Sequence, residues 1–435
     1  MPEPVVDGVA PGEPSAHGTR DVHGGDPTGR ARRARRPLRV LLVSQEFPPQ
    51  TDWGGIGTYA GILAPALAAA GAEVTVLSVV RGQARSRQVC NDVTVLRAPL
   101  HGLRGAGRLT AMPQAARRVA LARAVRREVL ALAVRPDVVE CPEWGAEGLL
   151  LGATGLPVVV RLHSSAAQLF PYTLQGAGLF GLDGRAAVAL EARAARRAAL
   201  VTSTAANAER GARALGIDAA SVRRIAHPVI AREPAPWPAD GPPRVLFAGR
   251  LEPRKGPETL MRAVPAVLAA VPGARFAFAG RDGGSAAGLQ RLADDLGVAH
   301  AVALLGHCDR VALEAQVAAA AVCAVPSRWE SFGNVVAEAA LLGRPVVASD
   351  IPPFRELVGD GHTGRLVAAT DAGAWASALV EILADPARAR AMGRDGAARV
   401  RALGDPARIA AQTLAAYRDA IAGAVGGTGA ARRRT

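Results

Sequence analysis

Lysine is almost absent from this chain of 435 residues: Lys255 is the only one, and arginine supplies the rest of the 52 basic side chains. Aromatic residues are scarce as well, at 4% of the sequence. Proteins that bind nucleic acid without sequence preference interleave basic and aromatic side chains, because the aromatic rings stack on bases. The scarcity of aromatics therefore argues against a nucleic-acid partner, although the formal net charge is +14.

Long apolar runs are also missing. No stretch reaches the roughly 18 apolar residues of a membrane-spanning helix, and residues 1–36 contain no apolar segment typical of a secretion signal. The cysteines (Cys90, Cys141, Cys308 and Cys323) form no CxxC pair. This pattern predicts a reduced, cytoplasmic protein with buried thiols.

The positive charge is concentrated in the first half of the chain. Such an excess favours peripheral contact with an anionic membrane surface. The alternative is that arginine, which is abundant throughout, only covers solvated helices.

Residues 1–36 are rich in proline, glycine and charge, which predicts a disordered tail. A β-branched run at Leu38–Ser44, a helical pattern at Tyr59–Ala70 and a strand pattern at Glu73–Ser78 then follow, as in a βαβ unit. The first half has further expected strands at Val93–Arg97, Val138–Cys141, Val158–Leu162 and Leu200–Ser203.

The proline-rich residues 231–243 predict a hinge linker. Strand patterns resume after it at Arg244–Gly249, Arg275–Ala279, Val302–Leu305, Ala321–Val325 and Pro345–Ala348. We therefore expect an α/β protein with two doubly wound domains, at residues 37–230 and 244–424, and a basic disordered tail at 425–435. Ligands bind outside the carboxyl ends of open parallel sheets, so two facing sheets would form one central cleft.

Residues 325–349 carry the most informative motif. A strand ends near Pro326, a polar loop contains Glu330, and a helix expected from about Asn334 contains Glu338. Gly333 allows close backbone approach to a ligand, and the helix N-terminus after it is a natural phosphate site. Two carboxylates could then bind hydroxyl groups on either side of a diphosphate.

A second motif, residues 247–260, places Arg250 and Lys255 in one loop directly after a strand. Both side chains could clamp an anionic group there. The compact ammonium of a lone lysine suits a phosphate oxygen, although an unreplaced surface lysine is the alternative.

Together the two motifs resemble those of family-4 retaining glycosyltransferases. The resemblance covers nearly all of residues 37–424 and implies the GT-B fold, with two Rossmann-like domains. It also implies no cofactor: the substrates are a nucleotide sugar, with UDP favoured and GDP as the alternative, and a small-molecule, glycan or lipid acceptor.

The resemblance assigns roles position by position. Arg250 and Lys255 would hold the donor diphosphate, and Glu330 would contact the transferred hexose, so these three are expected catalytic residues together with His163. Donor contacts are expected at Gly55, Gly57, Gly249, Phe332, Gly333, Asn334, Val335 and Glu338, the last of these on the nucleotide ribose.

The first half matches the family less sharply. His163 follows an expected strand and would face the sugar and the acceptor, although a buried core histidine is the alternative. Glu143 and Trp144 are expected on the acceptor side, or else belong to an ordinary turn. His227 stands where many members have Asn, and the role of Glu356 stays open.

Metal-dependent transferases stabilise the leaving diphosphate with a divalent ion on a DxD motif, and this chain contains none. We therefore expect metal-independent transfer, in which protein cations stabilise the leaving group. The resemblance implies that this transfer proceeds with retention. Two rival functions are an epimerase or glycosyl phosphorylase on the same fold, and a non-enzymatic basic protein that binds nucleic acid or a membrane surface.

Overall fold

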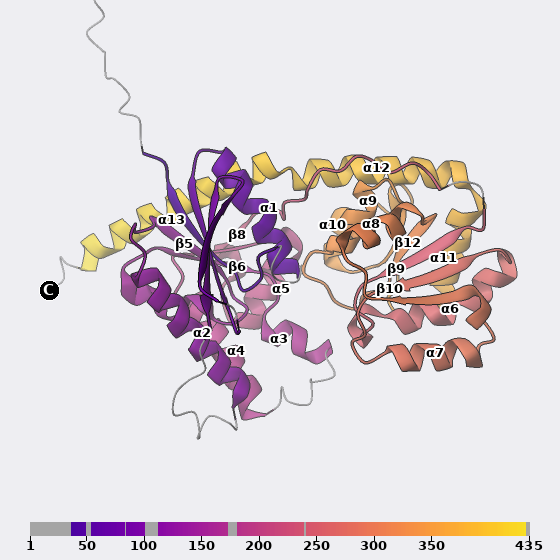
Figure 1. The fold of residues 1–435 in the computed structure, drawn as a ribbon, viewed down its shortest axis with the longest axis horizontal. Helices are drawn as coiled ribbons and strands as arrows, with labels where there is room; N and C mark the ends of the chain where they lie inside the picture. The colour runs from indigo at the N-terminus through magenta and orange to yellow at the C-terminus, as the bar shows by residue number, and fades with distance from the viewer. Residues whose placement is uncertain are drawn as a thin grey trace, which may run out of the picture. The chain divides into compact units, whose positions relative to one another are not determined.

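The computed structural model describes residues 36–48, 54–82, 84–100, 112–172, 181–238 and 241–431. The tail expected at residues 1–36 lies outside these ranges except for Arg36. The described residues from Pro37 onward belong to one compact unit, which contains two sheets (Figure 1).

The first sheet has eight strands, and all neighbouring strands are parallel except β3 and β4. In spatial order they are β3 (Ser86–Cys90), β4 (Val93–Pro99), β2 (Glu73–Val80), β1 (Arg39–Val43), β5 (Val138–Pro142), β6 (Val158–Leu162), β7 (Leu200–Ser203) and β8 (Val222–Arg224).

The second sheet has six strands, and all of its pairs are parallel. In spatial order they are β11 (Val302–Gly306), β10 (Arg275–Ala279), β9 (Arg244–Ala248), β12 (Val322–Val325), β13 (Val346–Ser349) and β14 (Gly364–Val367). These two parallel sheets confirm the predicted α/β class.

Helices cover both faces of each sheet (Figure 1). Those of the first half are α1 (Gly55–Ala69), α2 (Pro113–Leu130), α3 (Ala166–Leu169), α4 (Leu182–Arg196) and α5 (Ala205–Leu215). Those of the second half are α6 (Pro257–Ala270), α7 (Ala286–Asp295), α8 (Arg310–Ala318), α9 (Asn334–Leu341), α10 (Pro352–Leu357), α11 (Ala372–Ala384), α12 (Pro386–Gly404) and α13 (Pro406–Ala431). Short 3-10 turns lie at Glu147–Thr154, Phe170–Tyr172, Ala219–Ser221, Pro253–Lys255 and Ala299–Ala301.

Alternation along the strands divides each core into two layers. In β9, Val245 and Phe247 face the layer that contains α6 and α11, whereas Leu246 and Ala248 face the layer that contains α9. Since side chains of a strand point alternately to opposite faces, a continuous apolar run is what a strand covered on both faces requires.

The C-terminal helix crosses residue 424, where the basic tail was expected to begin. α13 continues to Ala431, past the expected start of the disordered tail. Ile409, Leu414 and Tyr417 pack in the core layer of β1 and α1, so this helix covers the first sheet although it follows the second in sequence. The apolar face of α13 is therefore buried against the core of the first half of the chain, not against that of the second half.

Candidate active site

The strand order indicates where each sheet would bind a ligand. The order reverses between β1 and β5 in the first sheet and between β9 and β12 in the second. Open parallel sheets bind ligands at such reversals, outside the carboxyl ends of the strands. Both charged motifs of the second half lie in the loops that follow β9 and β12.

The structure joins these two motifs through an ion pair. Lys255 lies in the turn after β9, and Glu330 lies in the loop between β12 and α9, 75 residues away. The Lys255 ammonium donates to Glu330 Oε1, and the Ser327 hydroxyl donates to the same oxygen at 3.0 Å. The side chains of Lys255 and Glu330 are only 17% and 12% exposed.

Arg254 is a second buried cation at Glu330, and the sequence analysis missed it. Its Nη1 lies 3.7 Å from Glu330 Oε2, and its Nη2 pairs with Glu252 at 2.6 Å. Arg250, by contrast, is 62% exposed and lies 3.6 Å from Glu252. An exposed guanidinium beside this pair is accessible to an anionic ligand.

The charges around Glu330 keep its carboxylate ionised. Burial acts to raise the pKa of Glu330, but the cations of Lys255 and Arg254 outweigh it and hold that pKa below its usual value. Burial lowers the pKa of Lys255, and the charge of Glu330 partly offsets this effect. Each partner therefore favours the charged form of the other in a largely dry environment.

The N-terminus of α9 follows immediately. Gly333 caps the helix with φ of +107°, and a Cβ at this position would lie 2.5 Å from Phe354 Cε1. Backbone and space therefore both require glycine. Gly333 has no side chain to cap the first amides of α9, which is the arrangement that attracts phosphate.

The glycine-rich loop of the first half approaches this helix. α1 begins at Gly55, and a Cβ on Gly55 would lie 3.8 Å from Asn334 Nδ2. The Gly57 amide donates to Glu46 at 3.4 Å, so a carboxylate of the chain itself lies at the start of α1. The two helix N-termini thus lie close together, as the predicted donor contacts require.

The remaining predicted donor residues lie along the same elements. Gly249 has φ of +147° and lies beside Lys255, whose Cδ would be 3.8 Å from a Cβ at this position. Val335 packs against the core below α9. Glu338 is half-buried, and burial raises its pKa although the charges of Arg310 and Arg232 oppose the rise.

His163 lies directly after β6 in a cluster of rings. The Tyr59 ring makes edge contacts with both histidines, with its centroid 4.8 Å from that of His163 and 5.4 Å from that of His227. His227 in turn stacks on Phe332 at 4.2 Å. Burial, with the nearby Arg161 charge, holds the pKa of His163 well below its usual value, so the imidazole is neutral.

Two other side chains of the first half contact the loop that carries Glu330. Arg210 Nη2 donates to the Glu330 carbonyl oxygen at 3.0 Å, and Tyr172 stacks on Trp329 at 6.4 Å. The sequence analysis did not identify Arg210, Tyr172 or Tyr59, because none of them belongs to a local motif.

The predicted acceptor-side residues have different environments. The Glu143 side chain is fully buried, and both of its oxygens accept from the His163 amide, at 2.9 and 2.8 Å. Burial raises the pKa of Glu143 to about 8. Trp144 lies under the Arg118 guanidinium at 5.2 Å, with Phe170 against its edge. Contact of either residue with an acceptor stays a prediction.

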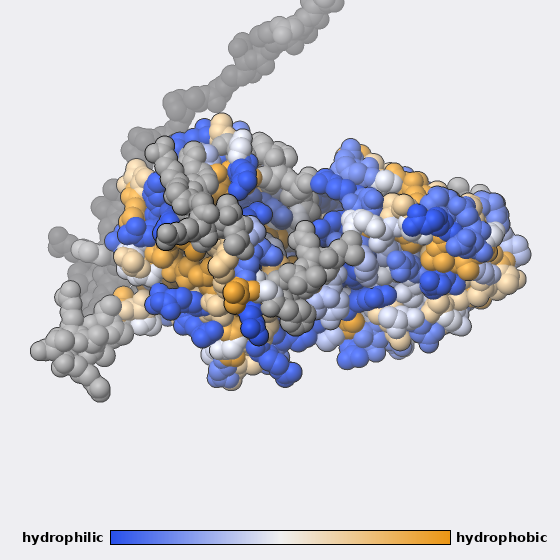
Figure 2. Space-filling model, turned by 90° about the horizontal axis from the view of Figure 1, so that it is seen from below, coloured by the Kyte–Doolittle hydropathy of each residue, from blue (hydrophilic) through white to orange (hydrophobic). Residues whose placement is uncertain are grey.

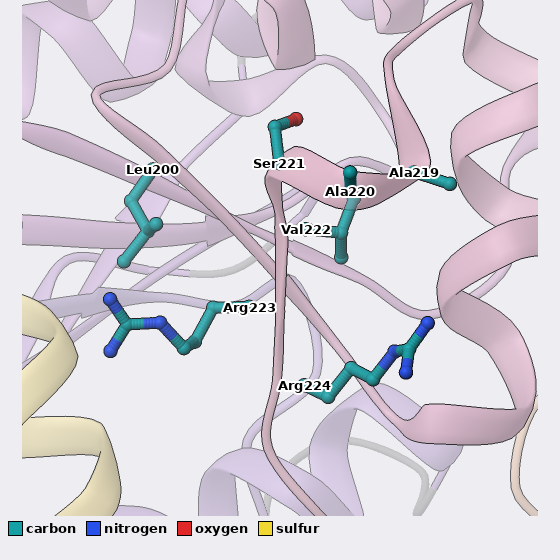
Figure 3. Close-up of a pocket in the computed structure, with 7 residues that line it drawn as sticks. All are labelled: Leu200, Ala219, Ala220, Ser221, Val222, Arg223 and Arg224. Carbon is teal, nitrogen blue, oxygen red and sulfur yellow. The ribbon is translucent and has the colours of Figure 1, made fainter.

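Two surface hollows lie away from this site. One of about 550 Å³ lies at the edge strand β8 and is lined by Leu200 and residues 219–224 (Figure 3). Another of about 530 Å³ lies beside Leu149 and Arg126. Neither contains a predicted site residue, so we locate the site from the convergence of charged groups.

No cluster of three or more His, Cys, Asp or Glu suited to a metal occurs within the described ranges.

Two family models match the chain. Residues 54–228 match the glycosyl transferase 4-like domain, and residues 230–399 match glycosyl transferases group 1. The glycogen synthase of Mycobacterium tuberculosis is 30% identical over 87% of this chain and 94% of its own length. The chain belongs to the group 1 glycosyltransferases.

Other relatives support the membership and the fold. The D-inositol 3-phosphate glycosyltransferase of Mycolicibacterium paratuberculosis is 40% identical, but the match covers only 41% of this chain and 40% of that relative. The sucrose-phosphate synthase of Thermosynechococcus elongatus is 26% identical and superimposes with a TM-score of 0.69, over 89% of this chain and all of that one. This glycosyltransferase therefore has the predicted GT-B fold.

Proposed function

We propose that this glycosyltransferase moves a hexose, with retention and without a metal ion, from a nucleotide diphosphate sugar to a small-molecule, glycan or lipid acceptor. The observation that carries the proposal is the buried Lys255–Glu330 pair at the strand-order reversal of the second sheet. A UDP-sugar is the favoured donor and a GDP-sugar the alternative.

The chemistry of transfer assigns a task to each group. Cleavage of the sugar–phosphate bond leaves negative charge on the diphosphate, while the sugar becomes oxocarbenium-like. Lys255, the exposed Arg250 and the first amides of α9 would stabilise the diphosphate. Glu330 would accept hydrogen bonds from sugar hydroxyl groups, and its charge would stabilise the electron-poor ring. The neutral His163 would bind the sugar or the acceptor hydroxyl.

Protein cations take the place of a divalent ion in this proposal. Activity should therefore survive excess EDTA, because chelation removes nothing that the diphosphate needs. Turnover is measured with and without the chelator, and donor turnover that disappears with EDTA and returns with Mg²⁺ or Mn²⁺ would overturn metal independence.

The acceptor could also lie at a membrane surface. Within the described ranges no helix is both long and apolar enough to cross a bilayer. α2 exposes Arg123, Arg126 and Leu130. On the face of the molecule shown in Figure 2, hydrophobic and hydrophilic residues lie side by side. Peripheral contact with an anionic membrane is therefore part of the proposal for a lipid acceptor.

The test is a screen of nucleotide sugars for slow donor hydrolysis and for thermal stabilisation of the protein. One donor should raise the melting temperature and be hydrolysed without an acceptor. A glycosyl phosphorylase would instead need inorganic phosphate, and a non-enzymatic binder would hydrolyse no donor.

A further inference from the structure

The backbone of His163 is held from both sides by buried side chains. Its amide donates to Glu143 Oε1 and Oε2, at 2.9 and 2.8 Å, and its carbonyl oxygen accepts from Asn207 Nδ2 at 3.2 Å. Glu143 belongs to the loop after β5, and Asn207 belongs to α5. Their side chains are 0% and 1% exposed.

The Asn207 amide is itself fixed in orientation. Gln168 Nε2 donates to Asn207 Oδ1 at 2.9 Å, which leaves Asn207 Nδ2 to point at His163. Gln168 Oε1 accepts from the amide and the hydroxyl of Ser165, at 3.2 and 3.3 Å, in a capping box at the start of α3. The amide groups of Asn207 and Gln168 are therefore each held in one orientation, because both the oxygen and the nitrogen have a partner.

A further buried carboxylate ties the neighbouring loops together. Glu191 on α4 accepts from the Gly145 amide at 3.3 Å and from the Ala166 amide at 2.8 Å, and it pairs with Arg118 at 2.6 Å. Gly145 follows β5 and Ala166 begins α3. The loops on either side of His163 are thus fixed to the same side chain.

Stability alone does not account for this network of buried polar side chains. Burying polar groups is unfavourable unless every one is paired, and an apolar core of the same volume is often at least as stable. Its geometric effect is concentrated on one residue, because the His163 amide and carbonyl are both bound by side chains. The Tyr59 ring packs against the imidazole itself, with the ring centroids 4.8 Å apart.

We propose that Glu143 and Asn207 are positioning residues that clamp the backbone of His163 and thereby aim its imidazole at the reacting sugar. The proposal rests on the proposed function, in which His163 contacts the sugar or the acceptor. Both side chains are buried, so in this proposal they act through the His163 backbone. A displaced imidazole lowers turnover, since errors of about 1 Å in a catalytic group cost up to roughly a hundredfold in rate.

The experiment compares Asn207→Ala, Glu143→Leu and Glu143→Gln in the full chain, with UDP-glucose hydrolysis as the activity probe. Gln keeps an oxygen that accepts from the His163 amide, whereas Leu does not. Thr202→Val is the matched control: Thr202 is 1% exposed on β7, and its hydroxyl has no hydrogen-bond partner within the described part of the chain.

Asn207→Ala and Glu143→Leu should lower kcat by about tenfold or more, with KM for the donor within about twofold of wild type. Glu143→Gln should restore most of the turnover. In a His163→Ala background the loss caused by Asn207→Ala should disappear, since the clamp acts only through that side chain. If Asn207→Ala lowers kcat as much in the His163→Ala background as in the wild type, the proposal is overturned.

Amide hydrogen exchange tests the clamp without activity. Exchange at the His163 amide should accelerate in Glu143→Leu and stay near wild type in Glu143→Gln and Thr202→Val, and unchanged exchange in Glu143→Leu overturns the clamp. A wild-type protein that hydrolyses no nucleotide sugar, but shows this exchange pattern, would instead contradict the proposed function and leave the clamp in place.

Discussion

Glu330 shares its carboxylate between two cations, so its charge has two separable effects. It orients Lys255 and Arg254, and in the proposed function it also contacts the transferred sugar. Glu330→Gln should lower kcat for donor turnover by at least tenfold, because one charge-assisted hydrogen bond contributes about 1.5–3 kcal/mol. The variant should still fold, which a melting curve checks.

Glu338→Gln is the matched comparison, since it changes the other glutamate of the same motif. Its proposed contact is with the ribose, which does not react, so we expect a higher donor KM with little change in kcat. Donor kinetics equal to wild type in either variant would remove that residue from the site.

Lys255 offers a sharper test because the chain otherwise uses arginine. A guanidinium keeps the charge but is planar and bulkier than an ammonium, and at 17% exposure little room surrounds it. Lys255→Arg should therefore lose at least an order of magnitude in donor turnover, or about 1.4 kcal/mol. Lys255→Ala should lose more, and normal activity of both variants would show that Lys255 does not bind the diphosphate.

The sequence predicts individual site residues only where a local motif carries them. Lys255 and Glu330 stand in recognisable loops, and the structure pairs them with each other. Asn334 begins α9 and lies close to Gly55. Arg254 does not stand out in an arginine-rich chain, because only its burial and its distance to Glu330 mark it. Arg210 reaches the Glu330 carbonyl from 120 residues away, and no local pattern encodes that contact.

The turn from the Glu330 loop into α9 depends on one glycine. Gly333→Ala would place a methyl group 2.5 Å from Phe354 Cε1 at a φ of +107°, so either the turn or the ring must move. We expect a loss of about 1–3 kcal/mol in stability together with reduced donor turnover, because Glu330 and the α9 amides move with the turn.

Gly361→Ala is the control for this prediction. Gly361 has φ of +76°, and a Cβ there would meet nothing within 4 Å. Gly361→Ala therefore measures only the stability lost when alanine adopts a positive φ, and its donor turnover should equal that of the wild type. Equal effects of the two substitutions on turnover would show that the Gly333 turn does not position the site.

Strands were predictable where they are buried on both faces. Val158–Leu162 and Arg275–Ala279 have the predicted bounds, because each is a short segment dominated by apolar residues, VVVRL and RFAFA. The sequence analysis missed β3, β8 and β14. β3 is a largely exposed edge strand with the sequence SRQVC, and β8 contains only three residues, two of them exposed arginines. Neither has an apolar pattern to detect.

α13 makes the two halves of the chain interdependent. The Tyr417 hydroxyl donates to Glu140 at 2.9 Å, and Glu140 also accepts from Tyr59 at 3.0 Å. Tyr59 is the residue whose ring lies against His163. The last helix of the chain is thus bonded into the core below the candidate site of the first sheet, which a division at residue 424 could not anticipate.

Buried acids should give the molecule an unusual dependence of stability on pH. Glu147 is fully buried, and burial raises its pKa to about 8, with the side chain of Gln45 partly opposing the rise. Its usual value is 4.5. Between these values the folded protein binds a proton that the unfolded chain has released, so the stability contributed by this group falls as pH rises.

Glu147→Gln removes this titration while keeping a polar group of similar size. The wild type should lose stability relative to the variant as pH rises from 5 to 8, at up to roughly 1.4 kcal/mol per pH unit. Glu143 has a similarly raised pKa, and the buried His227, with its pKa lowered to about 3, adds a slope of opposite sign below pH 6.5. The His227 contribution is common to both proteins and cancels in the difference. The Glu143 charge adds to the rise in the Glu147 pKa, so its effect on Glu147 is part of what the difference measures.

Urea unfolding at pH 5, 6, 7 and 8 provides the measurement, with Glu209→Gln as the control for loss of an exposed carboxylate, since the Glu209 side chain is 69% exposed. The free-energy difference between Glu147→Gln and wild type should change steadily in favour of the variant as pH rises, whereas the control difference should stay flat. A pH-independent difference for Glu147→Gln would mean that this carboxyl is already ionised in the folded protein, and that the loop after β5 holds a buried charge rather than a neutral acid.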